Sequence, residues 1–105
     1  MSFARDATML STLVEQFEHQ GFAGQFAARS DGRLACLTCH EVSDARDVTV
    51  SGLRRAEGAS DPDDMLAVAA VTCPRCQAHG TLVLGYGPNA SADDADALRL
   101  LADHA

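Results

Sequence analysis

The sequence predicts a small α+β fold in which antiparallel β-hairpins are flanked by an N-terminal and a C-terminal helix. Three observations predict it: an amphipathic stretch near each end, short apolar runs between turn residues, and two C-x-x-C pairs that each follow such a run. A chain of 105 residues is the usual size of one domain. We expect a helix over about 6–20, a ribbon of hairpins over about 22–87 and a helix over about 91–103.

The N-terminal segment 6–20 has apolar residues at the spacing of an amphipathic helix. The expected stripe consists of Leu10, Leu13, Val14 and Phe17. Asp6 or Thr8 can cap the start of this helix, and Gly21 is typical of its end. We expect the stripe to pack on the domain's own sheet.

The stretch "FAGQFAARSDGRLAC" predicts a hairpin that delivers the chain to the first cysteine. Phe22, Phe26 and Ala28 share one strand face, because side chains alternate along a strand. Asp31-Gly32 is a two-residue turn signal, and the returning strand reaches Cys36.

The middle of the chain predicts a second, longer hairpin. A turn or single helical turn is expected over 43–47, and a strand from Val48 towards Glu57, weakened by Gly52. "GASDPDD" is loop chemistry, and the apolar run Met65–Val71 predicts a buried strand. "GTLVLGYG" predicts the strand that follows the second cysteine pair.

The C-terminal helix is predicted by its cap and its stripe. Ser91 is the expected N-cap, and Asp94, three residues on, completes a capping-box pattern. The expected apolar stripe consists of Ala95, Leu98, Leu101 and Ala102.

The four cysteines of the chain all lie in C-x-x-C pairs, and 33 residues separate the pairs. A C-x-x-C pair forms a tight knuckle that aims two sulfurs at one point, and two knuckles complete a tetrahedron. We therefore expect one structural Zn²⁺ per chain, bound by Cys36, Cys39, Cys73 and Cys76.

Other chemistries at these cysteines are less well supported. "CLTCH" matches a c-type haem attachment site, but a haem would leave Cys73 and Cys76 without a role. "CPRC" lies between strands and lacks the following helix of thioredoxin-like pairs. Four thiolates leave no open position for catalytic water. His40 and His79 remain alternative ligands, and His40 also suits the left-handed backbone that often follows a knuckle.

Two strand-fed knuckles at Cys36/Cys39 and Cys73/Cys76 resemble a zinc ribbon. The stretches "GASDPDDM" and "GTLVLGYGP" are similar to small zinc-ribbon proteins of high-GC bacteria. The resemblance covers 22–87 and implies a metal and a fold, with no activity attached. Ribbons often carry glycine just after a knuckle, whereas this chain has His40 and Gln77 there.

The net charge and the motifs that the sequence lacks limit the functions to be expected of this protein. The net charge of −7 and the absence of any basic segment argue against binding to nucleic acid. No signal peptide or membrane span is recognisable, so we expect a cytoplasmic protein with reduced thiols. No catalytic constellation can be recognised, which indicates a protein that is not an enzyme.

Three functions remain as hypotheses. A protein-interaction or adaptor module, with another protein as partner, is favoured by elimination. A nucleic-acid-binding ribbon would use Arg54 and Arg55, with Arg46 and Arg75, although a solvated strand face is the simpler interpretation. A zinc-linked thiol switch is the third. Tyr86, the only tyrosine, suits either a partner contact or a strand end, and the sequence favours the strand end.

Overall fold

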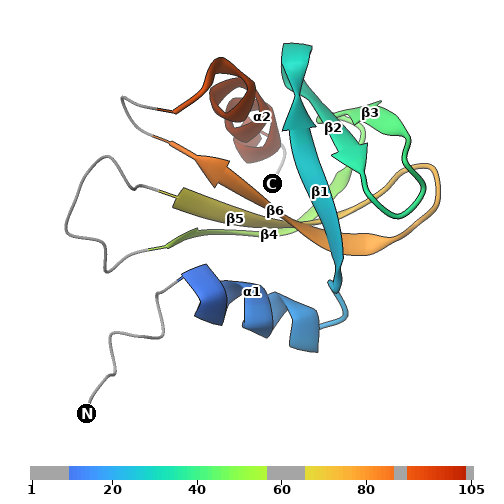
Figure 1. Ribbon diagram of the computed structural model, residues 1–105, viewed down its shortest axis with the longest axis vertical. Helices are drawn as coiled ribbons and strands as arrows, with labels where there is room; N and C mark the ends of the chain where they lie inside the picture. The colour runs from blue at the N-terminus through green and yellow to red at the C-terminus, as the bar shows by residue number, and fades with distance from the viewer. Residues whose placement is uncertain (1–9, 57–65, 87–89, 104–105) are drawn as a thin grey trace.

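The computed structural model describes residues 10–56, 66–86 and 90–103, which form an α+β fold of two helices and one six-stranded mixed sheet (Figure 1). In chain order the elements are α1 (Leu10–His19), β1 (Gly24–Arg29), the 3-10 turn η2 (Ser30–Gly32), β2 (Arg33–Cys36), β3 (Val42–Asp44), β4 (Thr49–Ala56), β5 (Leu66–Thr72), β6 (His79–Gly85) and α2 (Ala92–Asp103). The predicted fold class is therefore confirmed at the level of α+β.

The strands follow the order β3-β2-β1-β6-β5-β4, and every neighbouring pair is antiparallel except β1 and β6. The expectation of antiparallel hairpins alone was therefore wrong at this one pair, which joins two hairpin systems into a single sheet. Gly24 lies opposite Gly80, and a Cβ at position 80 would lie 2.5 Å from the carbonyl carbon of Gly24. Only glycine permits so close an approach of the two backbones.

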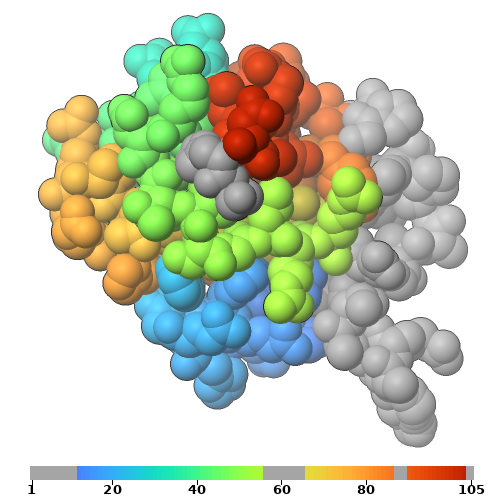
Figure 2. All heavy atoms as spheres, turned by 180° about the vertical axis from the view of Figure 1, so that it is seen from behind, coloured from blue at the N-terminus to red at the C-terminus, as the bar shows by residue number. Residues whose placement is uncertain are grey.

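The sheet is curled, because its two edge strands are joined by only four residues, 45–48. In a flat sheet β3 and β4 would lie about 24 Å apart, since adjacent strands are spaced by about 4.8 Å. The five Cα–Cα steps from Asp44 to Thr49 span at most about 18 Å. On the back of the molecule, the green segment from β3 to β4 runs between α2 and α1 (Figure 2).

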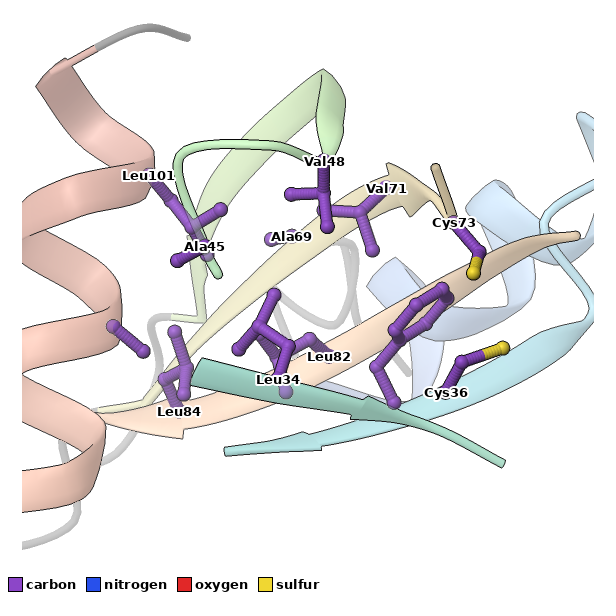
Figure 3. Close-up of a cluster of buried hydrophobic side chains, with 12 residues drawn as sticks. Leu34, Cys36, Ala45, Val48, Ala69, Val71, Cys73, Leu82, Leu84 and Leu101 are labelled. Atoms are coloured by element: carbon purple, nitrogen blue, oxygen red, sulfur yellow. The ribbon is translucent and has the colours of Figure 1, made fainter. Parts of the chain in front are cut away.

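The main core fills the inside of this curl. It combines side chains from β1, β2, β5 and β6 with Ala45 and Val48 from the link between the edge strands. At one end α2 contributes Leu101, and at the other end Cys36 and Cys73 close the cluster (Figure 3). The core therefore runs continuously from the second helix to the cysteines.

α1 packs on the outer side of the sheet, where Leu13 and Phe17 contact Val68 and Ala70 of β5. Two of the four predicted stripe residues are thus buried, Val14 is half-buried, and the side chain of Leu10 lies outside the described set. The helix ends as predicted at Gly21, with φ of 101°. The N–H groups of Phe22 and Gly21 donate to the carbonyls of Phe17 and Glu18, which is the Schellman pattern. The predicted caps at Asp6 and Thr8 lie outside the described residues.

α2 is rotated relative to the predicted stripe. Ala97 and Leu101 are buried, whereas Ala95 and Ala102 are exposed, so the prediction was wrong for these two alanines. The Ser91 hydroxyl caps the helix as predicted, accepting the Asp94 N–H at 3.1 Å.

The Asp94 carboxylate does not complete a capping box. It accepts the N–H of Gly85 at 2.9 Å instead, so it ties the start of α2 to the end of β6. This bond turns residue 94 towards the sheet. Positions 97, 98 and 101 lie on the same side of a helix as residue 94, so these are the positions that meet the core.

The middle strands largely match their predictions. β5 and β6 fall where the apolar runs predicted them, and β4 begins one residue after Val48. Only the end of the predicted turn, 45–47, is a turn, because Val42–Asp44 pairs with β2 as the short edge strand β3. Gly52 lies at a register shift in β4, and a Cβ there would lie 2.9 Å from the Phe17 ring. The "GASDPDD" loop lies outside the described residues.

We predict that Gly80→Ala destabilises the fold by about 2 kcal/mol, because the added methyl would force β1 away from β6. Gly85→Ala in the same strand is the matched control. Its nearest contact is the Asp94 carboxylate at 3.4 Å, and it should change stability by less than about 1 kcal/mol. Urea unfolding followed by circular dichroism measures both, and equal effects of the two changes would contradict the prediction.

Candidate metal centre

Each C-x-x-C pair occupies the turn between two antiparallel strands. Cys36 is the last residue of β2 and Cys39 lies in the turn from β2 to β3, whereas Cys73 and Cys76 both lie between β5 and β6. In the first turn the Cys36 N–H donates to the Glu41 carbonyl at 2.9 Å, and the His40 N–H donates to the Cys36 carbonyl at 2.7 Å. The second turn repeats both bonds at the equivalent residues, Cys73, Gln77 and Ala78.

The residue after each knuckle has a left-handed backbone, with φ of 65° at His40 and 66° at Gln77. This conformation was predicted for His40, and it accounts for a histidine directly after the second cysteine of "CLTCH". Glycine is the usual residue at such a position, but histidine also adopts this conformation more often than most. The absence of glycine therefore leaves the knuckle geometry intact.

The curl of the sheet brings the two knuckles together. The four sulfur atoms all lie within 4.8 Å of one another. Cys36 Sγ lies 3.8 Å from Cys76 Sγ, and Cys39 Sγ lies 3.9 Å from Cys73 Sγ, so the close pairs cross from one knuckle to the other. A tetrahedron with metal–sulfur bonds of about 2.3 Å has sulfur–sulfur edges of about 3.8 Å. The four cysteines are thus positioned to bind one metal ion.

Hydrogen bonds favour the thiolate at Cys73. Burial would raise the pKa of this thiol, but the N–H groups of Cys76 and Arg75, with the neighbouring thiols, outweigh burial and lower the pKa to about 7. Both N–H groups point at Cys73 Sγ, from 3.5 Å and 3.3 Å respectively. The first negative charge of the cluster therefore forms here.

The neighbouring thiols oppose any further ionisation. The Ala78 N–H favours the thiolate of Cys76, but burial and the adjacent thiols outweigh it and raise the pKa of Cys76 to about 12. The pKa of Cys39 is also raised: the Glu41 N–H and the Cys76 thiol act to lower it, but burial and the thiols of Cys36 and Cys73 outweigh them. Four thiolates this close together require a cation among them. Protons must compete with that cation, so its affinity falls as the pH falls.

A side chain of the second knuckle reaches across to the first hairpin. Arg75 Nε donates to the hydroxyl of Ser43, which lies on β3, at 3.3 Å. Ser43 is itself buried on the core face of the edge strand. The two knuckles are therefore linked by a direct hydrogen bond as well as by the sulfur cluster. The sequence predicted no role of this kind for Arg75.

Neither candidate histidine joins the sulfur cluster among the residues that the structure describes. His79 forms a hydrogen bond of 2.7 Å between its Nδ1 and the Thr72 hydroxyl, across the base of the second knuckle. Its ring also contacts Phe22, with ring centroids 5.2 Å apart. His79 therefore packs at the base of the knuckle rather than pointing at the sulfurs.

The four candidate arginines do not form one basic face. Arg54 and Arg55 are successive residues near the Leu66 end of the β4–β5 hairpin, whereas Arg75 lies beyond its Thr72 end. The Arg55 guanidinium lies 5.3 Å from the centroid of the Tyr86 ring. Tyr86 directly follows β6, which agrees with the predicted strand end.

Comparisons with known protein families, with characterised proteins and with solved structures give no match, so none supports the resemblance to zinc ribbons. Within residues 10–56, 66–86 and 90–103, no helix has the length and apolar character needed to cross a membrane. The chemistry of the site therefore rests on the geometry of the four cysteines.

We predict that removing the metal unfolds the region from 33 to 87. A structural zinc contributes about 10–16 kcal/mol of apparent binding energy in zinc-finger peptides, whereas a whole domain has about 5–15 kcal/mol of net stability. A strong chelator under reducing conditions, or Cys73→Ser alone, should abolish amide-exchange protection in β5 and β6. The two helices should be lost as well, because neither is long enough to persist alone.

Leu37→Ser is the control for Cys73→Ser. Leu37 lies in the first knuckle, is 43% exposed and is not one of the clustered cysteines. This variant should retain both metal and protection. Unchanged protection in 66–84 after verified metal removal would show that the apolar core alone maintains the fold.

Proposed function

We propose that this chain is a small structural-zinc protein that serves as a protein-interaction or adaptor module. The observation that carries the zinc assignment is the set of four sulfurs within 4.8 Å, with cross-knuckle distances close to the edges of a zinc–thiolate tetrahedron. Four thiolates and no other donor favour zinc, a closed site and a structural role. The bound ion would hold the β2–β3 and β5–β6 turns together.

The adaptor role is supported by an uncovered part of the sheet. α1 covers β5, but Ala27, Ala35 and Val42 form a cross-strand row on the outer side of β1, β2 and β3. Val42 is 38% exposed, and Val83 on β6 is 41% exposed. A groove of about 360 Å³ lies beside this row, lined by Val14, residues 25–28, Thr81 and Val83. We call Ala27, Val42 and Val83 the outer face; Ala35 lies between Ala27 and Val42 in the row but is itself buried.

Charge at one end of the outer face supports an acidic partner. Arg29 and Arg33 lie directly opposite each other, and like charges in that position are destabilising. Asp31 is only a distant partner of Arg33, at 3.9 Å. Asp44 lies opposite Arg33 on β3, but its carboxylate accepts the hydrogen bonds of Arg46, which together with the charges of Arg46 and Arg33 lower its pKa to about 2. A partner protein that brings apolar side chains and a carboxylate would suit this surface.

We predict that the purified protein is colourless and contains one zinc per chain. Elemental analysis of protein produced in medium that also supplies iron and cobalt gives the metal and its stoichiometry. A Soret band that depends on Cys36 and Cys39 would indicate haem, and a cluster chromophore would indicate iron; either result would overturn the zinc assignment.

A second prediction concerns the partner. Affinity capture from the native organism should recover a protein that wild-type chain retains and Val42→Asp loses, because the new carboxylate disrupts the apolar outer face. Ala102→Asp is the matched control: it adds the same charge at an exposed position of α2, away from the outer face, and should capture normally. Circular dichroism and zinc content should be unchanged in both variants.

The nucleic-acid alternative requires that the protein binds DNA, whereas the adaptor proposal predicts that it does not. With a net charge of −7 and dispersed arginines, the protein should not bind duplex DNA at about 0.15 M salt. A salt-sensitive gel shift that disappears when Arg54 and Arg55 are changed to Ala would replace the adaptor proposal. In the capture experiment, equal recovery of the partner by wild-type and Val42→Asp chains would show that the partner does not bind the outer face.

A further inference from the structure

The four clustered thiols differ sharply in their access to solvent. Cys36 and Cys73 are only 2% and 1% exposed, since both belong to the main core. Cys39 is half-buried, and Cys76 is exposed. Residues 74, 75 and 77 around Cys76 are exposed as well. Of the four clustered cysteines, Cys76 is therefore the residue most open to a small water-borne oxidant.

The thiol best placed to react next with Cys76 lies in the other knuckle. Cys36 Sγ lies 3.8 Å from Cys76 Sγ. Cys73 belongs to the same knuckle as Cys76, but its sulfur accepts N–H groups from Arg75 and from Cys76 itself. Those bonds hold the Cys73 sulfur in its own turn, whereas Cys36 Sγ faces Cys76 Sγ from the other knuckle.

We propose that Cys76 is the oxidation site of this protein and that Cys36 resolves it into a disulfide between the two knuckles. The inference rests on the proposed zinc function, since a bound ion keeps both sulfurs as thiolates. The Cys76 thiolate attacks hydrogen peroxide, the O–O bond breaks, and a sulfenic acid and hydroxide form. The Cys36 thiolate then attacks the Cys76 sulfur, the S–O bond breaks, and a second hydroxide leaves.

In the balanced reaction the two thiolates together lose two electrons, and one hydrogen peroxide is reduced to two hydroxides. The hydroxides then take up protons and become water. Two of the four sulfurs that would hold a zinc ion are consumed in this reaction, so the ion would be released with its oxidation state unchanged. Cys39 and Cys73, 3.9 Å apart, remain to form a second cross-knuckle disulfide with another peroxide.

A cross-knuckle disulfide has a structural consequence that a disulfide within one knuckle lacks. It joins β2 to the β5–β6 turn, 40 residues apart in sequence, at the place where the metal had joined them. Closing so long a loop constrains the unfolded chain. The oxidised protein should therefore lose its zinc and keep its fold, whereas chelation under reducing conditions removes the zinc and the fold together.

The experiment treats the zinc-loaded full chain with hydrogen peroxide and follows zinc release with a chromogenic chelator and folding by circular dichroism. Trypsin cleaves after arginine, so Cys36 and Cys39 fall in peptide 34–46, Cys73 in peptide 56–75 and Cys76 in peptide 76–99. We expect peptides 34–46 and 76–99 to be joined, with the bond assigned to Cys36 by fragmentation. A sulfenic-acid trap added early should label peptide 76–99 first.

Release of one zinc per chain with an unchanged helical signal, reversed by reductant and added zinc, is the expected result. Joined peptides 56–75 and 76–99, an early label on 34–46, or loss of the helical signal on oxidation would each overturn the inference and leave the zinc assignment intact. A chain that contains no zinc before peroxide is added would instead overturn the proposed function. The two failures are thus distinguished by the first measurement.

Discussion

The convergence of four cysteines at one point is the constraint on which the rest of this structure depends. Their sulfurs lie within 4.8 Å of one another, and only a cation among them lets all four ionise. Two of the sulfurs belong to the main core, so this charge cannot be moved to the surface without opening the core. The candidate metal centre and the hydrophobic interior therefore share residues, so a metal ion bound by the four sulfurs would stabilise both.

The route of the chain makes this convergence possible. The four-residue link from β3 to β4 forces the sheet to curl, and the curl brings the β2–β3 turn to the β5–β6 turn. Gly24 and Gly80 permit the parallel contact of β1 with β6, which is the joint between the two hairpin systems. Arg75 adds a polar link between the same two systems through Ser43. The sulfur geometry is thus a product of backbone constraints far from the cysteines.

Features set by local chemistry could be predicted from the sequence, and features set by distant pairing could not. The two cysteine knuckles, the Gly21 helix end and the Ser91 cap each depend on a few adjacent residues. The parallel β1–β6 pair depends on two glycines 56 positions apart, and nothing local marks them as partners. The side of α2 that meets the core depends on the Asp94 carboxylate, which accepts the Gly85 N–H instead of capping its own helix. For β3, three residues of mixed polarity give too short an alternation to distinguish an edge strand from a turn.

The alanine-rich composition and the four-cysteine site have complementary effects on the stability of the core. Ala45, Ala69 and Ala97 are fully buried, and each removes little apolar area from water compared with a leucine. Small side chains nevertheless allow the edge-strand link and α2 to approach the curled sheet closely. A core of this kind has less hydrophobic stabilisation than one built from larger side chains, and a metal ion bound by the four cysteines at its far end would add stability. Cys36 and Cys73 are themselves members of this core, so a metal ion bound there would stabilise the same cluster that the small alanine side chains leave weakly held.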